Sequence, residues 1–432
     1  MFKARFAIIV TVFALVACGD DDKGSNPMGS GSSGSGSSGI DVPSSYVFDS
    51  RFTPGESSVS YSGQVVRNLL LQDLKIFTGN LGKEGAQSAS AEDMLRFYAH
   101  DDAYGMSTLT SPKDYSAVES SYTAMSTGKN LSGKVASDVV IGYDKTADAL
   151  VREWIDIIAE NSQDPAKLGT PAVYTTEDGV DLSQMINKVL IGAVPYYQAT
   201  GKYLYLLFEK GNAAAKEGKT YTDMEHYWDE AFGYFGAAAD FNMYSDADIK
   251  AGVSRDSNGD GKVDFKSEYN FAIAKGAAKR DLGGTGVDFT ADIFTAFLTG
   301  RTLIVNEAAQ ADIELQRSAA ANGMEKVIAA TVVHYINDTL GDMAKYGTSD
   351  YSATDHNKHW AEMKGYAVGL QFNAFKLISD SQLSELHGIF GKAPKYLEVG
   401  SSEYDQEVKN YQRAKQVMQD AYGFSNANVE NW

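Results

Sequence analysis

Apolar residues recur at helical spacing through most of this 432-residue chain. Spacing of three and four residues puts side chains on one face of an α-helix, and that face must be buried against another element. Alternating strand patterns are scarce, with residues 171–176 (PAVYTT) the best candidate, and only eight prolines interrupt the helical pattern. The sequence therefore predicts an all-α body of about nine to twelve helices. Helical stripes lie at 66–77, 139–158, 185–208, 289–305, 324–346, 361–378 and 404–422.

A short motif occurs twice within these helical stretches. The pattern W-x-E-x-x-G-Y begins at Trp228 and again at Trp360, and a histidine, His226 or His359, precedes each copy. Internal repetition of this kind indicates two related structural units. The predicted division is a first helical bundle at 44–285, with the longer insertions, and a second at 286–432.

The N-terminal residues predict export and a lipid anchor. Lys3 and Arg5 precede an apolar run at 6–17 that is too short to span a bilayer, so residues 1–17 are interpreted as a signal peptide. The run ends in LVAC at Cys18, which resembles the lipobox of bacterial lipoproteins and implies acylation of Cys18. Residues 18–43 follow as a lipidated end and a flexible Gly/Ser linker. We expect a protein held at the membrane by this lipid in the bacterial cell envelope, at the periplasmic face of the outer membrane or at the cell surface.

Charge and cysteine content exclude several functions. The formal net charge is −19 and the sequence pI is about 4.7, so the chain repels nucleic acid. Cations, neutral solutes or other envelope proteins are the expected partners. Cys18 is the only cysteine, which leaves the body without disulfides and excludes thiol catalysis there.

Residues 256–268 resemble a calcium loop of the EF-hand or dockerin type. Alternate oxygen-bearing residues on a tight turn suit Ca²⁺, and Gly261 stands where such a loop needs its sharp bend. Position 12 is Ser267, so the usual glutamate is replaced by Glu268 one residue later. We expect a structural Ca²⁺ that fixes a loop between helices. Its ligands would be Asp256, Asn258, Asp260, the carbonyl of Lys262, Asp264 and Glu268.

A second candidate site lies on the helix that carries the first motif. Thr222 and Glu225 form a capping-box pattern, which places the start of the helix at Thr222. Histidine and glutamate four residues apart can share a metal ion, but they can equally form a hydrogen bond between packed helices. If the two repeats face each other, their polar residues would converge on one cleft. The candidate cleft residues are His226, Asp229, Glu230, His359 and Glu362.

Three long strings, SSYVFDSRFTPGESSVSYSGQVVRNLL, HYWDEAFGYFG and SNGDGKVDF, resemble a family of uncharacterised bacterial lipoproteins that is catalogued as a domain of unknown function. The resemblance extends from about residue 44 to about 422. That family is similar in outline to the imelysins, which implies an exported, all-helical protein with two pseudo-symmetric bundles and an association with iron uptake. Imelysins carry Gly-x-His-x-x-Glu, whereas the first motif here reads His226-x-x-x-Glu230.

Three functions stay open from these residues. The first, which we favour, is a non-enzymatic envelope lipoprotein that binds a ligand or a metal. The second is a metal-dependent hydrolase or peptidase, although H-E-x-x-H and G-x-S-x-G are both absent. The third is a surface module that binds carbohydrate or protein through some of the 25 tyrosines. A transition metal is compatible with the first two functions.

Overall fold

The computed structural model describes residues 40–432. The predicted signal peptide, Cys18 and most of the linker lie outside the described residues. From Asp41 to Trp432 the chain forms one compact unit. None of the helices in this part combines the length and the apolar character needed to cross a membrane.

The described residues are mostly helical, which confirms the all-α prediction. Fourteen α-helices are present in residues 40–432, more than expected. They are α1 (Ser62–Asn80), α2 (Ala91–Tyr98), α3 (Tyr122–Met125), α4 (Ala147–Ser162), α5 (Leu182–Ile191), α6 (Asp223–Phe235), α7 (Asp246–Ala251), α8 (Ala272–Gly283), α9 (Phe289–Val305), α10 (Gln310–Met343), α11 (Ala353–Gly369), α12 (Asp380–Phe390), α13 (Ser402–Tyr422) and α14 (Asn426–Asn431).

Shorter elements connect these helices. A π-helix, η4 (Gly192–Tyr203), continues α5 and accommodates Pro195. Two short strands, β1 (Ser116–Ala117) and β2 (Lys262–Val263), pair in parallel. The 3₁₀ turns are η1 (Asp102–Tyr104), η2 (Ser132–Lys134), η3 (Pro171–Val173), η5 (Leu207–Glu209), η6 (Phe241–Met243) and η7 (Leu370–Phe372).

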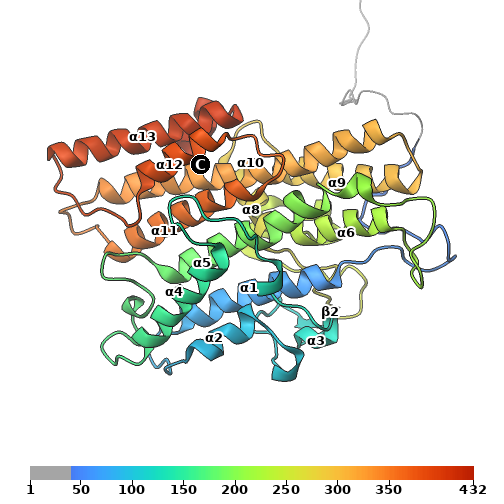
Figure 1. Cartoon of the computed structure of the whole chain (residues 1–432), viewed down its shortest axis with the longest axis horizontal. Coiled ribbons are helices and arrows are strands. Elements are labelled where there is room, and N and C mark those ends of the chain that lie inside the picture. Colours follow the sequence, from blue (N-terminus) through green and yellow to red (C-terminus); the bar gives the residue numbers. More distant parts are fainter. Residues whose placement is uncertain (1–39) are drawn as a thin grey trace, which may run out of the picture. The chain divides into compact units, whose positions relative to one another are not determined.

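The long helix α10 organises the unit. It packs against α9, α11, α8 and α13, and its apolar face is buried through Val327, Ile328, Val332 and Val333. In Figure 1 it extends from the side that carries α9 to the side that carries α13. Because four helices share its surface, residues distant in sequence meet along it.

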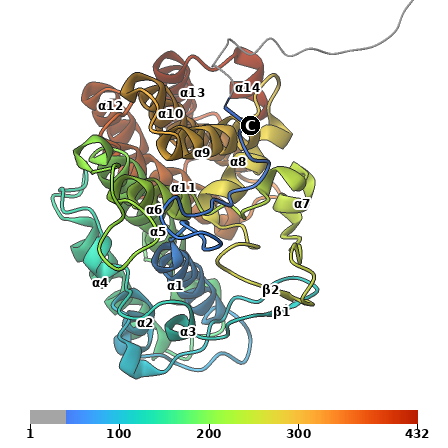
Figure 2. The same cartoon turned by 90° about the vertical axis from the view of Figure 1, so that its right-hand side faces the viewer.

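A second group of helices lies against this layer. Turning the view places α1, α2, α3 and the strand pair below α9, α10 and α13 (Figure 2). α11 packs against α5 and α6 packs against α9, so helices from 44–285 and from 286–432 are in direct contact. The division into two related bundles stays a prediction.

The crossing between η4 and α11 is unusually close. An added Cβ on Gly192 would lie 2.3 Å from the Cα of Gly369. Only glycine permits two backbones to approach this closely. The contact therefore fixes α5 and η4 against α11.

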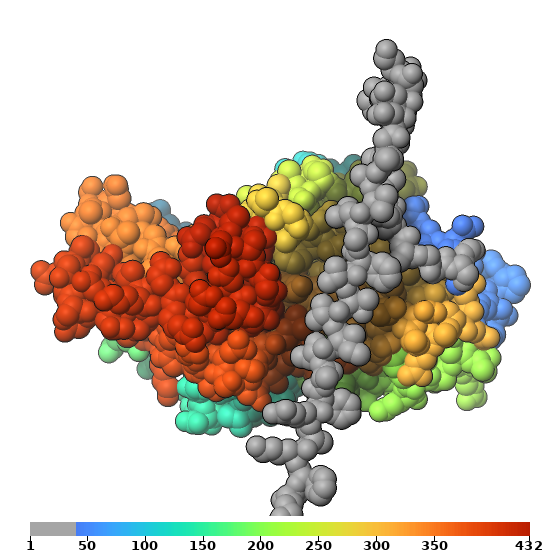
Figure 3. Space-filling view, turned by 90° about the horizontal axis from the view of Figure 1, so that it is seen from above, coloured from blue at the N-terminus to red at the C-terminus, as the bar shows by residue number. Residues whose placement is uncertain are grey.

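The C-terminal residues close back onto earlier helices. The indole Nε1 of Trp432 donates to the carbonyl of Arg280 in α8 (2.8 Å), and Asn337 of α10 donates to the carbonyl of Trp432 (2.8 Å). Figure 3 shows this C-terminal surface, in red, bordering the yellow surface of α8.

One predicted strand is wrong. Residues 171–173 form the 3₁₀ turn η3, because Thr170 caps its N-terminus and Pro171 has the fixed φ that suits a first helical position. Thr175 makes only an isolated bridge with Asp181.

Candidate functional site

Helix α6 begins where the capping box predicted. The side chain of Thr222 accepts from the amide of Glu225 (3.1 Å), and Glu225 Oε2 accepts from the amide of Thr222 (2.7 Å). Two of the helix's otherwise unpaired amides are thereby satisfied. The cap fixes the direction of the predicted site residues on this helix.

Asp229 is part of a buried ion cluster. Its Oδ1 accepts from Arg301 Nε and from the Tyr46 hydroxyl, each at 2.8 Å, and Arg301 Nη1 lies 3.0 Å from Glu225. Arg301, Asp229 and Glu225 are all fully buried. Burial raises the pKa of Asp229, while Arg301 acts to lower it. Arg51 Nε, 3.3 Å from Glu225 Oε1, supplies the second positive charge of the cluster. Because an uncompensated buried charge is strongly destabilising, we interpret Asp229 as a residue that holds α6 against α9 and not as a cleft residue.

His226 and Glu230 lie at the edge of α6 in a packed environment. Glu230 Oε1 accepts from Gln64 of α1 (2.6 Å), and His226 Nε2 is 3.8 Å from Glu230 Oε2. The imidazole stacks on Tyr221, with ring centroids 4.6 Å apart. This arrangement matches the alternative reading, in which the pair links packed helices.

On α11, the second motif has different partners. Glu362 Oε1 lies 3.2 Å from Lys188 Nζ of α5, and Glu362 Oε2 lies 3.8 Å from Lys358 Nζ. His359 Nδ1 is 2.6 Å from Asp342 Oδ2. Although burial lowers the pKa of His359, Asp342 and Asp338 raise it above the ordinary value.

Three residues near His359 were not predicted. His334 Nε2 and His359 Nε2 both approach one oxygen of Asp338, at 3.3 and 3.9 Å, while Asp342 orients the other side of the His359 ring. Burial, followed by Arg280, lowers the pKa of His334 to about 3, so this imidazole is neutral. Their spacing of four residues along α10 (His334, Asp338, Asp342) places them on one helix face and is the sequence signal for this cluster.

The two predicted sets of cleft residues do not meet. Glu230 is bonded to Gln64 near the start of α1, whereas Glu362 shares a cavity with Lys75. Eleven residues separate these points on α1, which is about 16 Å at the rise of an α-helix. Across residues 40–432, no group of three or more His, Cys, Asp or Glu side chains has the arrangement needed to hold a metal ion.

The copies of the motif nevertheless have matching surroundings. The indoles of Trp228 and Trp360 are fully buried, and each donates to a phenylalanine carbonyl, Phe297 at 2.9 Å and Phe390 at 3.2 Å. The glycine of each motif lies against a neighbouring helix. A Cβ on Gly233 would be 2.6 Å from Tyr61 Cβ, before α1, and one on Gly365 would be 2.6 Å from Lys188 Cβ.

The calcium-type loop lies between α7 and α8, and its side chains already bond to its own backbone. Asp256 Oδ2 accepts from the amide of Gly261 (2.8 Å), Asn258 from Asp260 (2.9 Å) and Asp260 from Lys262 (2.8 Å). Gly261 has φ of +83°, as the sharp bend requires. Lys262 begins β2, so the loop is joined to β1.

Glu268 closes this loop from inside. It is 1 % exposed, and its Oε1 accepts from the amides of Ser257 (2.8 Å) and Asn258 (3.2 Å). Its Oε2 accepts from the amide of Asp264 (2.8 Å). Both oxygens are therefore occupied by backbone donors, and Glu268 has one lone pair at most to offer a cation.

A cavity of about 220 Å³ lies beside Glu362, between α1, α5, α8, α10 and α11. Its charged lining consists of five basic side chains and one acidic one, a surplus of four positive charges in a chain of net charge −19. The tyrosines Tyr335 and Tyr366 complete one wall. We call it the cationic cavity, and its charged residues are Lys75, Lys188, Lys275, Lys279, Arg280 and Glu362.

Burial shifts the charged groups of the cationic cavity. It lowers the pKa of Lys75 to about 8, and it lowers the pKa of Arg280 as well. Burial also raises the pKa of Glu362, but Lys188 and Lys358 outweigh it and hold the value low. The cavity thus keeps its carboxylate ionised beside a surplus of cations in its lining, and Asp181, outside the lining, offsets part of the charge of Lys75 and Lys188.

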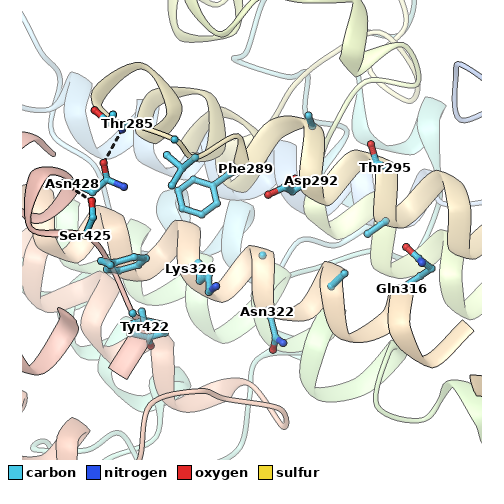
Figure 4. A pocket seen from close by; sticks show the side chains of 18 residues that line it. Thr285, Phe289, Asp292, Thr295, Gln316, Asn322, Lys326, Tyr422, Ser425 and Asn428 are labelled. Carbon is cyan, nitrogen blue, oxygen red and sulfur yellow. Dashed lines mark hydrogen bonds between the residues drawn. The ribbon is translucent and has the colours of Figure 1, made fainter. Parts of the chain in front are cut away.

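A larger cavity of about 710 Å³ lies between α9, α10 and the C-terminal residues. In Figure 4, Phe289 and Asp292 project from α9 opposite Lys326 of α10, and the amide of Thr285 donates to Asn428 Oδ1 (2.7 Å) at one end. Most of the labelled groups are short polar side chains, and this cavity carries little net charge.

Comparison with known proteins identifies the family. Residues 43–374 match the family model described as Domain of unknown function (DUF4856). The chain belongs to this family. No curated protein and no solved structure matches the chain. The lining of the cationic cavity, from Asn68 to Tyr366, falls entirely within the region that defines DUF4856, whereas the larger cavity also uses residues 422–428.

Proposed function

We propose that this DUF4856 protein is a non-enzymatic, ligand-binding lipoprotein of the bacterial cell envelope, and that its ligand occupies the cationic cavity. The observation that supports the proposal is Arg280, which lines this cavity with two guanidinium nitrogens buried and lacking any hydrogen-bond partner in the described part of the chain. A buried cation without a partner is costly, and a bound ligand would offset that cost. Helices that form the wall would position the ligand rigidly.

The anchor and the ancestry of the fold are part of the same proposal. Cys18 would carry the lipid, and the linker would leave the body free of the membrane surface. The matching surroundings of Trp228 and Trp360 support two related bundles, an outline similar to the imelysins. An association with iron uptake is the biological setting that this similarity suggests.

Calcium would have a structural role. Side-chain oxygens of Asp256, Asn258, Asp260 and Asp264 lie on one tight loop, and Ca²⁺ takes six to eight such ligands. Glu268 would mainly hold the loop closed, with the carbonyl of Lys262 available as a further ligand. The ion would fix the segment that leads from α7 through β2 to α8.

A transition metal is the second candidate ligand. His334 and His359 approach Asp338, with Asp342 behind His359 as an outer carboxylate would be, but a metal would require this cluster to rearrange because it does not have the geometry of a metal site as it stands. A bound metal ion with a free coordination position would instead support the alternative function, a metal-dependent hydrolase.

The test is native mass spectrometry with elemental analysis on the full-length protein purified from bacterial membranes. We expect a small ligand to co-purify and to be lost in Ala272→Leu, which fills part of the cationic cavity. Ala291→Leu, which fills the larger cavity, is the matched control. We expect calcium to be lost only in Asp256→Ala/Asp260→Ala, and any iron or zinc only in His359→Ala.

Three outcomes would contradict parts of the proposal. If the ligand is retained in Ala272→Leu, it binds outside the cationic cavity. Chemical conversion of the bound compound during incubation would make the protein an enzyme. An unlipidated Cys18 in the purified protein would remove the anchor.

A further inference from the structure

The positive charge of the cationic cavity is concentrated against the charge of the whole protein. Five of the chain's 38 Lys and Arg residues line one cavity of about 220 Å³, while acidic residues outnumber basic ones by 19 overall. Glu362 is the single acidic side chain in the lining, and it is already paired with Lys188. The local surplus indicates an anionic ligand.

Arg280 lines this space. The residue is 7 % exposed, its Nε and Nη1 have no hydrogen-bond partner, and within residues 40–432 it forms no ion pair. A guanidinium offers paired N–H donors that match two oxygens of a carboxylate or phosphate. Lys279, exposed beside it, provides a further cation at the opening.

Glu362 adds a hydrogen-bond acceptor to the basic donors of the same cavity. It is 4 % exposed, its Oε1 contacts Lys188, and its Oε2 has no hydrogen-bond partner and lies 3.8 Å from Lys358 Nζ. An ionised carboxylate only accepts hydrogen bonds. A ligand that forms a hydrogen bond with this oxygen must therefore carry a proton of its own, in addition to the negative charge that the cations require.

We propose that the cationic cavity binds inorganic phosphate as a protonated oxyanion, with Arg280, Lys188 and Lys75 contacting its charged oxygens and Glu362 Oε2 accepting its P–OH. This inference rests on the proposed function and names the ligand. Hydrogenphosphate retains a P–OH at neutral pH and so meets both demands. Sulfate has no proton to donate, so Glu362 would repel it.

The size of the cavity supports a compact ligand. Sites for drug-sized molecules usually occupy about 300–1,000 Å³, and the cationic cavity is smaller. A phosphate monoester is mostly a dianion at neutral pH, with no proton left for Glu362. Free phosphate therefore fits better than a phosphate ester.

The experiment is isothermal titration calorimetry on the full-length protein at pH 7.5 in a phosphate-free chloride buffer, after extensive dialysis. The probes are inorganic phosphate, sulfate and glycerol 3-phosphate. We expect one phosphate per chain, with sulfate and the ester weaker by about tenfold or more. Glu362→Gln, whose amide can donate, should lose most of the discrimination against sulfate.

Variants of the basic residues locate the site. Arg280→Met should weaken phosphate binding by about tenfold or more, and Arg280→Lys should recover part of that loss. Lys326→Met, which removes a cation from the larger cavity, is the control and should leave phosphate binding unchanged. Lys279→Met tests the opening of the cavity at an exposed residue. Circular dichroism verifies the folding of every variant.

The results separate this inference from the proposed function. Equal binding of phosphate and sulfate, or phosphate binding unaffected by Arg280→Met, would overturn the phosphate assignment. Tighter binding of the ester would assign the site to phosphate esters instead. If no oxyanion binds while a co-purified compound is displaced by Ala272→Leu, the phosphate assignment fails and the ligand-binding function stands. If nothing binds and nothing co-purifies, both fail.

Discussion

Buried charged side chains in this protein are of two kinds. The carboxylates of Asp229 and Glu225 are matched by Arg301 and Arg51, so this cluster holds α6 against α9 without an unpaired charge. Lys364 is different, because it is 1 % exposed and its nearest polar partner is the imidazole of His387, 3.1 Å away. No carboxylate in the described chain pairs with Lys364.

Lys364 gives the fold a characteristic pH dependence. Burial, followed by Lys392, lowers the pKa of Lys364 to about 7, and burial with Lys364 lowers that of His387 to about 3. The unfolded chain then binds more protons than the folded one between about pH 7 and 10.5, so stability rises with pH across that window. His387 adds a loss of stability as pH falls from about 6.5 to 3.

We predict that Lys364→Met is more stable than the wild type at pH 6 and that its advantage shrinks by pH 9.5. The difference is on the order of 1.4 kcal/mol for each unit of pKa shift that the substitution removes. Urea unfolding at both pH values measures it, with exposed Lys250→Met as the control. A loss of stability in Lys364→Met that is equal at both pH values would contradict the prediction.

At the scale of elements, the crossing of η4 with α11 sets the position of the cationic cavity. α5 carries Lys188 and α11 carries Glu362, so any separation of the two helices also separates this ion pair. Gly192 has ordinary helical dihedrals, φ −69° and ψ −51°. A side chain at this position would therefore clash with the backbone of Gly369, but it would not strain its own backbone.

We predict that Gly192→Ala destabilises the protein by about 3 kcal/mol, at the upper end of the usual cost of overpacking, because the obstacle is backbone. Gly341→Ala, in the exposed part of α10 with open space around its Cα, should instead stabilise by up to about 1 kcal/mol. Chemical denaturation of both variants checks the pair. Equal effects would show that helix propensity, and not the crossing, dominates.

Across the whole molecule, the last residue ties the C-terminus to the helices of the cationic cavity. Trp432 is 4 % exposed, packs edge-on against Phe424 with centroids 4.7 Å apart, and bonds to α8 through the carbonyl of Arg280. Its indole therefore supports the segment of α8 that directs the guanidinium.

We predict that Trp432→Ala lowers the free energy of unfolding by about 3–5 kcal/mol, as expected for a buried tryptophan, and weakens binding of the cavity ligand. Leu315→Ala, at a residue 66 % exposed, should leave both unchanged. Thermal unfolding and ligand titration on the same samples give the comparison. Full stability in Trp432→Ala would mean that the C-terminal contact contributes nothing.

Local signals in the sequence predicted local structure well. The start of α6 at Thr222 and the bounds of α9 followed from capping and apolar spacing, because both depend on neighbours a few residues apart. The first part of α10 was missed, since residues 310–323 are polar and alanine-rich and show no apolar stripe.

The candidate site depended on contacts that no local pattern contains. Only Glu362 among the charged residues of the cationic cavity was predicted, because its basic neighbours come from α1, α5 and α8 without a shared motif. The expected convergence of Glu230 with Glu362 required helices to face each other, and helix crossings are set by packing of side chains far apart in sequence. Asp229 was predicted to line the cleft because its ion-pair partner, Arg301, lies 72 positions away in the sequence.

The residues that line the cationic cavity are far apart in the sequence, so the proposed ligand would bind only a chain that has folded completely. Asn68 and Tyr366 lie on the same cavity with nearly three hundred residues between them. A chain made from its N-terminus therefore offers no site during most of its synthesis, and contacts this distant form late because loop closure is costly. The ligand would recognise finished molecules only, and each bound one would be stabilised against reopening by mass action. Loading with ligand would thus distinguish mature protein from partly assembled or nicked chains.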